Sequence, residues 1–306
     1  MKSKIIVFAV CLLGTHSLFS QNSIDLLTFA GQYSAPQSYK NNTPGLASER
    51  ILNVNLKLPI VLNDKLIWYN EFSYFNFHVS NSENIGDTVL NSMELHANIL
   101  QTGIMYKFSE KKALIALFVP RLMGDLKKIG NKTFQFGGML MYEKKVRQGL
   151  TLRYGVSLNQ ELFGPQLIPL LYVDWRIKKR WRIKGLLPIY LKIGYDVNER
   201  LRIGFHQVGL ITSYDITDTQ FPNDYVQRES IDLSLFSNIR LFDKVHFEAR
   251  FGYSLSRKYT QYRKGSKVDF ALPLVRFGDD RIQKNENFKD GAFINFRLMY
   301  RLPIVD

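Results

Sequence analysis

Residues Ser230–Leu255 read SIDLSLFSNIRLFDKVHFEARFGYSL, two alternating runs on either side of Phe242-Asp243-Lys244. In a β-strand, successive side chains point to opposite faces, so the alternation assigns each residue to a side. One face collects the apolar residues Ile231, Leu233, Leu235, Ile239, Leu241, Val245, Phe247, Phe251, Tyr253 and Leu255. The other face collects Asp232, Ser234, Asn238, Arg240, His246, Glu248, Arg250 and Ser254. The stretch therefore predicts a β-hairpin with one apolar and one polar face.

The length and register of this hairpin suit a membrane. Folding about Asp243 puts Ile239 opposite Phe247 and Asn238 opposite Glu248. Each strand has about a dozen residues, or roughly 40 Å, whereas a tilted strand of about 9–11 residues already crosses the hydrocarbon core. Apolar residues outside and polar residues inside are typical of a transmembrane β-barrel wall.

The same alternation recurs along the chain. Short turns are predicted at 63–64, 109–112, 147–149, 178–180, 197–200 and 242–244, and longer polar loops at 80–91, 215–229 and 256–290. Short turns on one rim and long loops on the other indicate an all-β, transmembrane antiparallel up-and-down β-barrel of about 14 strands, with 12 the next choice. The rival fold is a secreted β-sandwich, which would bury the apolar face under a second sheet. The predicted strands are 27–33, 51–62, 66–79, 94–108, 113–122, 134–146, 150–159, 166–177, 181–187, 189–195, 201–214, 230–241, 245–255 and 292–302.

A second hairpin can also be registered from its pattern. Turning at Gln148, it puts Val146 opposite Leu150 on the outside and Glu143 opposite Arg153 on the inside. An inward ion pair is thus predicted in both hairpins. Residues 268–277 are expected to form a further hairpin within the long loop, above the membrane.

The first 20 residues predict export. A basic start at Lys2 and Lys4 precedes an apolar run over residues 5–13 and a small residue at Ser20, as in a secretory signal peptide, so we expect cleavage after Ser20. The domains are then a signal peptide at 1–20 and an outer-membrane β-barrel at 21–306. Cys11, the only cysteine, lies within the apolar run, so the mature chain is expected to contain no disulfide.

The chain is strongly basic, with a formal net charge of +14, or +12 once the two lysines of residues 1–20 are removed. Lysines and arginines are spread through strands and turns rather than clustered, which disfavours nucleic-acid binding. Behind an export signal, the excess indicates contact with anionic lipid headgroups or passage of anionic solutes.

One segment, together with the signal peptide and the spacing of the loops, resembles a known family. The segment runs from Trp181 through Gly185-Leu186-Leu187-Pro188 to Tyr195-Asp196-Val197-Asn198-Glu199-Arg200-Leu201-Arg202-Ile203-Gly204. It looks like an uncharacterised group of Gram-negative outer-membrane β-barrels, carried as a domain of unknown function. The resemblance covers most of the mature chain. It implies location and fold and carries no activity.

Catalysis and metal binding are not expected. His246, Glu248 and Ser254 have residue types used by lipid hydrolases, but they face inward, and Ser254 lies roughly 25 Å along the strand from His246. His96 and His206 have no ligand-type neighbours at metal-binding spacing. Acidic residues between 279 and 290 match no calcium loop, so they indicate a solvated loop. We expect no cofactor and no enzyme activity.

Nine polar residues are expected to line the lumen: Glu143, Arg153, Asp232, Asn238, Arg240, His246, Glu248, Arg250 and Arg297. Their arginines either pair with the acids to hold a filled barrel together or line a watery path that favours anions. Inward Met139, Met141 and Phe236 narrow the interior and favour an occluded lumen.

The sequence favours an outer-membrane barrel for passive transport of a small or hydrophobic solute. The alternative is a non-conducting structural or surface-binding barrel that acts through loops 80–91, 215–229 and 256–290. A lipid-modifying enzyme is a remote third. The expected partners are outer-membrane lipid and lipopolysaccharide, the barrel-assembly machinery and an unidentified small solute.

Overall fold

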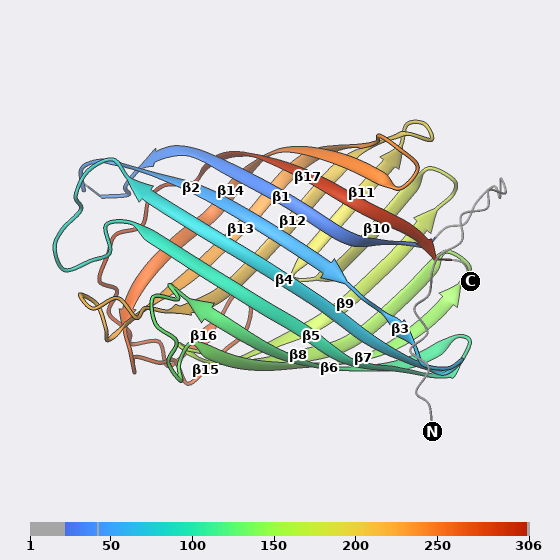
Figure 1. The fold of residues 1–306 in the computed structure, drawn as a ribbon, viewed down its shortest axis with the longest axis horizontal. Helices are drawn as coiled ribbons and strands as arrows, with labels where there is room; N and C mark the ends of the chain where they lie inside the picture. Colours follow the sequence, from blue (N-terminus) through green and yellow to red (C-terminus); the bar gives the residue numbers. More distant parts are fainter. Residues whose placement is uncertain (1–21, 42, 305–306) are drawn as a thin grey trace, which may run out of the picture.

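One sheet closes on itself in the computed structural model, which describes residues 22–41 and 43–304 (Figure 1). Each long strand pairs antiparallel with the next, and β1 closes the barrel by pairing with both β2 and β17. The prediction of an all-β, 14-stranded antiparallel barrel is confirmed. The long strands are β1 (Asn22–Ser38), β2 (Leu46–Lys57), β4 (Leu66–Asn81), β5 (Met93–Ser109), β6 (Lys112–Gly124), β7 (Phe134–Arg147), β8 (Leu150–Glu161), β9 (Gly164–Ile177), β10 (Trp181–Leu187), β11 (Tyr190–Asp196), β12 (Leu201–Asp215), β13 (Asp224–Arg240), β14 (Val245–Arg263) and β17 (Gly291–Ile304). Three two-residue strands complete the sheet: β3 (Ile60–Val61), β15 (Phe270–Ala271) and β16 (Arg276–Phe277).

The two ends of the barrel differ. β1 begins and β17 ends at the end that carries the short turns, which we call the turn end (Figure 1). The opposite loop end carries the connections 39–45, 82–92, 125–133, 216–223 and 264–290. The predicted signal peptide at 1–20 lies outside the described residues and stays a prediction.

The register of the β13–β14 hairpin is as predicted, with Asn238 opposite Glu248. In the β7–β8 hairpin Glu143 is opposite Arg153, also as predicted. The prediction that Val146 lies opposite Leu150 is wrong, because the ladder shifts between Lys145 and Arg147. This bulge places one extra residue at the turn, which alternation alone does not reveal.

Two predicted loops are shorter than expected. Strand β13 already begins at Asp224 and β14 continues to Arg263, so residues 224–229 and 256–263 are strand. Arg228 and Arg257 within these extensions are buried. Their polar side chains interrupt the apolar pattern by which a strand is recognised. The expected hairpin within 268–277 exists as β15 and β16, but it lies against the wall, where Ala271 pairs with Gln166 of β9.

The outer face is apolar and uncovered. Leu235 is 67% exposed and Phe251 is 66% exposed, so no second protein layer packs on this face. The rival β-sandwich is therefore wrong. An uncovered apolar belt around a closed barrel suits contact with hydrocarbon rather than with water. Among the described residues no helix is long and apolar enough to cross a membrane.

Candidate functional site: the barrel interior

The interior is packed shut at the loop end. Here β12 leaves the wall and crosses the interior, so that Asp215 pairs with Gly124 of β6, although five strands separate β6 and β12 along the wall. Tyr214 then packs edge-on against Phe77 of β4, with ring centroids 5.7 Å apart. These residues belong to a buried cluster that spans the interior, so no straight axial path runs through this half. The buried members of this loop-end core are Tyr39, Ala47, Phe77, Val79, Leu90, Met93, Leu95, Ala97, Met123, Tyr214, Ile216, Val226, Tyr259 and Phe288.

A fully buried charge cluster reinforces the loop-end core. The Glu49 carboxylate lies 3.4 Å from both Arg228 and Arg257 and also accepts hydrogen bonds from the Tyr259 and Ser34 hydroxyls. The side chains of Glu49 and Arg257 are 0% exposed. Buried charges are tolerated only when they are paired and hydrogen-bonded, which indicates a structural role for this Glu49 cluster.

Near the turn end, Glu248 of β14 is the centre of a second charge cluster. Arg250 donates to its carboxylate at 2.7 Å and Asn238 at 3.1 Å, while Lys192 of β11 forms an ion pair with it from across the interior. Arg297 approaches within 3.6 Å. In this Glu248 cluster the side chains of Lys192 and Arg297 are 25% and 24% exposed, so the cations face water-accessible space.

The remaining predicted lumen residues lie nearby. Arg153 donates to Glu143 at 2.6 Å, and its guanidinium lies 4.5 Å from the centre of the Tyr172 ring. His246 is within hydrogen-bond distance of Asn238, at 3.3 Å. Arg240 is half-buried and lies directly opposite His246, whereas Asp232 is buried and lies closer to the loop end along β13.

Sequence reasoning missed several interior residues. Lys192 sits in a short strand, where alternation on its own could have assigned it inward. Glu49, Glu161 and Arg228 were missed because they fall in or beside segments interpreted as loops. No sequence signal reveals that β12 crosses to β6, because that contact joins residues far apart in the chain.

Between the two charge clusters lies an apolar patch, which we call the methionine cluster. Met139 and Met141 of β7, both expected to face inward, pack there with Ile115, Ile168 and Leu170. Methionine is flexible and polarisable, and it suits surfaces that accommodate ligands of different shape. The interior therefore has a second apolar surface, on β6, β7 and β9, apart from the loop-end core.

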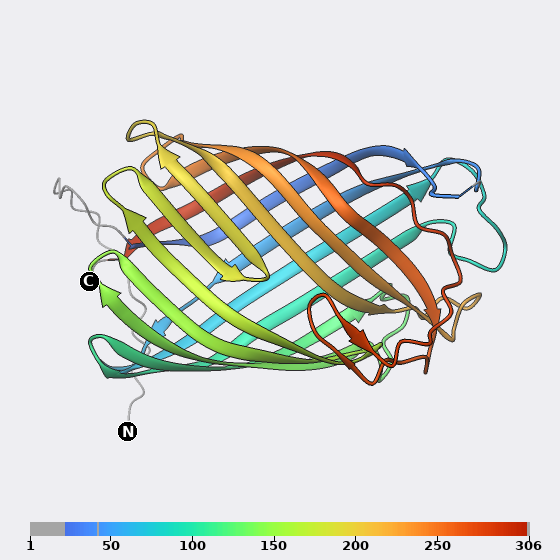
Figure 2. The same ribbon diagram turned by 180° about the vertical axis from the view of Figure 1, so that it is seen from behind.

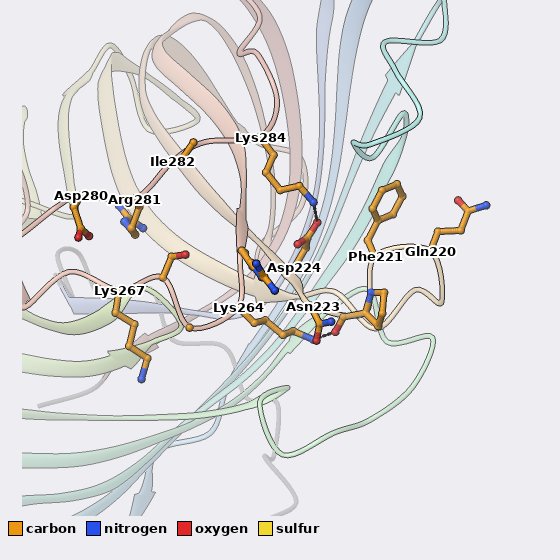
Figure 3. A pocket seen from close by; sticks show the side chains of 14 residues that line it. Gln220, Phe221, Asn223, Asp224, Lys264, Lys267, Asp280, Arg281, Ile282 and Lys284 are labelled. Atoms are coloured by element: carbon orange, nitrogen blue, oxygen red, sulfur yellow. Dashed lines mark hydrogen bonds and ion pairs between the residues drawn. The ribbon is translucent and has the colours of Figure 1, made fainter.

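A pocket of about 960 Å³ opens among the loops at the loop end (Figure 3). Two of the cations in its lining already have structural partners: Lys284 is paired with Asp224 at 2.5 Å, and Lys264 donates to the backbone oxygens of Ile216 and Pro222 at 2.8 and 2.9 Å. These contacts tie the loops together. We therefore assign the pocket no ligand.

Residue types used by lipid hydrolases also occur on the outer face near the loop end. His78 lies opposite Glu94 of β5, and Ser80 follows two positions after His78. In the described part of the chain His78 forms no hydrogen bond with Ser80 and no ion pair with Glu94; Ser80 instead contacts Ser48 at 2.9 Å. No metal-binding group of three or more His, Cys, Asp or Glu side chains occurs among the described residues.

Comparisons with known proteins identify a family. Residues 17–301 match the family model described as Domain of unknown function (DUF6268), which confirms the expected resemblance to an uncharacterised family. No curated protein sequence matches the chain.

Several solved barrels resemble the structure distantly. The COG4313 outer membrane channel from Pseudomonas putida F1 is 12% identical, with a TM-score of 0.47 and coverage of 90% of this chain and 94% of that one. The P. putida toluene transporter TodX is 11% identical, with a TM-score of 0.37 and coverage of 92% and 91%. The NanC porin is 8% identical, with a TM-score of 0.36 and coverage of 90% and 100%. Likeness at this level supports no statement about function.

Proposed function

We propose that this protein, which belongs to the DUF6268 family of domains of unknown function, is a Gram-negative outer-membrane barrel that passes a small hydrophobic solute without energy input. Three features support the location: an uncovered apolar belt, long loops confined to one end and the predicted signal peptide at 1–20. The turn end would then face the periplasm and the loop end the cell exterior. Lipopolysaccharide would contact the outer rim, and the barrel-assembly machinery would insert the chain.

One observation carries the choice of solute: the interior has a packed loop end, an apolar middle and a hydrated turn end. An ion that moves along the barrel axis would have to displace the packed side chains of the loop-end core and of the Glu49 cluster. A hydrophobic molecule has a binding surface in the methionine cluster, with water-accessible space beyond it toward the turn end. The geometry therefore favours a hydrophobic solute over a hydrated ion.

The test is uptake of the uncharged fluorophore N-phenyl-1-naphthylamine by porin-depleted Gram-negative cells that express the protein. We expect faster uptake than in cells with an empty vector, together with no steady ion current in planar bilayers. Met139→Lys places a charge in the methionine cluster and should slow uptake at least about fivefold, because charge is disfavoured on an apolar surface. Met139→Leu keeps the apolar volume and is the matched control.

The proposal fails if the unaltered protein gives no more uptake than the empty vector, or if Met139→Lys and Met139→Leu behave alike. Heat-modifiable gel migration verifies that each variant is folded. The second candidate, a surface-binding barrel, is favoured by the mutual anchoring of the loops, for example the bond from the Thr217 N–H to Asp125 at 3.0 Å. It predicts neither uptake nor ion current.

A further inference from the structure

The wall has one interrupted sector. Strands β10 and β11 have only 7 residues each, whereas the flanking β9 and β12 have 14 and 15. Crossing the hydrocarbon core takes about 9–11 residues, so this hairpin does not reach the far side. In Figure 2 it is the short yellow hairpin that ends partway along the wall. Beyond its turn at Pro188 and Ile189, only the two-residue strand β15, paired with Gln166, lies beside residues 164–170 of β9 on that side, and no strand joins them to residues 209–215 of β12; we call this interval the seam.

The β9 border of the seam has few hydrogen-bond donors. The Arg176 N–H donates to Gly149 on the β8 side, at 2.7 Å. Alternate residues of a strand point their backbone groups to alternate sides, so the odd-numbered residues of β9 face the seam. Two of these, Pro165 and Pro169, have no N–H, which leaves Leu167 as the donor between them.

One strand bridge and a few side chains hold the β12 border. Asp215 pairs with Gly124 of β6. The Ser213 N–H donates to the Glu161 carboxylate at 2.9 Å, and the Ser213 carbonyl accepts from the Gln135 side chain, also at 2.9 Å. The end of β12 is thus fastened by that bridge and by polar side chains of β7 and β8.

A segment of the long loop covers the seam from outside. Residues 264–277, which include β15 and β16 and which we call the flap, form the red hairpin near the loop end in Figure 2. The flap is attached to β9 by the Ala271–Gln166 bridge, and the Val268 N–H donates to the carbonyl of Phe163 at 2.8 Å. Its tip residue Leu274 is 87% exposed. An apolar tip on the outer wall suits contact with lipid.

Opening the seam breaks fewer backbone hydrogen bonds than opening a long strand pair. Between β8 and β9, for example, a continuous ladder joins all twelve residues of β8 to β9. Each ladder bond lost into hydrocarbon leaves polar groups unsatisfied, at several kcal/mol per group. Lifting the flap and parting β9 from β12 breaks the Ala271–Gln166 bridge, the Val268–Phe163 bond, the Arg276–Glu229 ion pair and the side-chain hydrogen bonds of Ser213.

The seam leads directly to the methionine cluster. Ile168 and Leu170, on the β9 border, belong to that cluster, and Ile189 at the hairpin turn packs against it. On the β12 border, Leu210 is 37% exposed and lies on the same strand face as the interior residues His206 and Tyr214. On the outer side, Ile211 of β12 packs with Val268 and Ala271 of the flap. Both faces of the seam are therefore apolar.

We propose that the seam is a lateral portal between the outer leaflet of the membrane and the methionine cluster, and that the flap is its cover. The solute it admits is an uncharged hydrophobic molecule that partitions into lipid before it enters the barrel. This inference rests on the proposed function and specifies its route.

A reversible cross-link tests the portal. In a Cys11→Ser background, Gln166→Cys with Ala271→Cys joins the flap to β9 at a registered pair, where the Cα spacing of paired strands suits a disulfide. The matched control, Leu140→Cys with Val156→Cys, joins a registered pair of the β7–β8 ladder. Uptake of N-phenyl-1-naphthylamine is measured in both variants before and after addition of dithiothreitol.

We expect the oxidised flap cross-link to slow uptake at least fivefold and dithiothreitol to restore it, while the control changes less than twofold. Unchanged uptake in the oxidised flap variant, or an equal loss in the control, would overturn the portal and leave the proposed function standing. Absence of uptake by the unaltered protein would overturn both. The reduced form of each variant reports whether the substitutions themselves disturb the barrel.

Discussion

The two halves of the interior handle charge in different ways. At the loop end, Glu49 lies between Arg228 and Arg257, whose side chains are 5% and 0% exposed. At the turn end, Glu248 is just as buried, but its partner Lys192 is 25% exposed. Water can therefore reach two of the three cations around Glu248, namely Lys192 and Arg297, but neither arginine beside Glu49. The loop-end charges hold protein together, and the turn-end charges border a hydrated space.

The largest expected effect is that of Glu49→Ala. Removing the carboxylate leaves two buried guanidinium groups without their acid, which lowers the free energy of unfolding by about 3–5 kcal/mol. Urea titration of the barrel in detergent micelles measures this loss. A loss under about 1 kcal/mol would contradict a dry loop-end core.

A smaller effect is expected for Glu248→Gln. Two of the three cations that lose its charge, Lys192 and Arg297, can turn toward water, and the glutamine oxygen can still accept from the buried Arg250, so the loss should be about 1–3 kcal/mol in the same titration. A loss as large as that of Glu49→Ala would contradict the difference in hydration between the two halves.

The smallest effect concerns the loops. A hydrogen bond from the Lys127 side chain, joined by the Gln220 N–H at 2.8 Å, lowers the pKa of Asp218 below its usual value. A carboxyl with a lowered folded-state pKa stabilises the fold above its unfolded pKa, and this contribution is lost as the pH falls through the folded value. Protection of the amides in 216–223 against hydrogen exchange, taken relative to the intrinsic exchange rate at each pH, should therefore fall below about pH 4. Asp218→Asn should abolish this pH dependence, and its persistence would assign it to another group.

Alternation predicted the barrel well because lipid contact imposes a strict period of two on the outer face. It failed where that constraint ends. Arg228 and Arg257 lie in strand extensions that pack against the protein's own core. These extensions are therefore polar in sequence although they are strands and not loops. The extra residue, Val146, lies at a turn, where a bulge costs little free energy, and the alternation of polar and apolar residues does not reveal it.

The site was predicted less completely than the wall. Local pairs such as Glu143 and Arg153 follow from a hairpin register and could be identified. The loop-end core could not, because it depends on β12 crossing to β6. The short strands on either side of Pro188 were visible in the sequence, but their meaning depends on the lengths of β9 and β12 beside them.

The two prolines on the border of β9 also bear on encounters between neighbouring molecules in a crowded bilayer. When the flap does not cover it, an interrupted wall has a sheet edge onto which a second chain can add a strand, the first step toward fusing barrels into arrays. Pro165 and Pro169 withhold the amide hydrogens that such an addition needs. The two prolines thus disfavour strand addition at the seam, whereas a solute that forms no hydrogen bonds can still enter there.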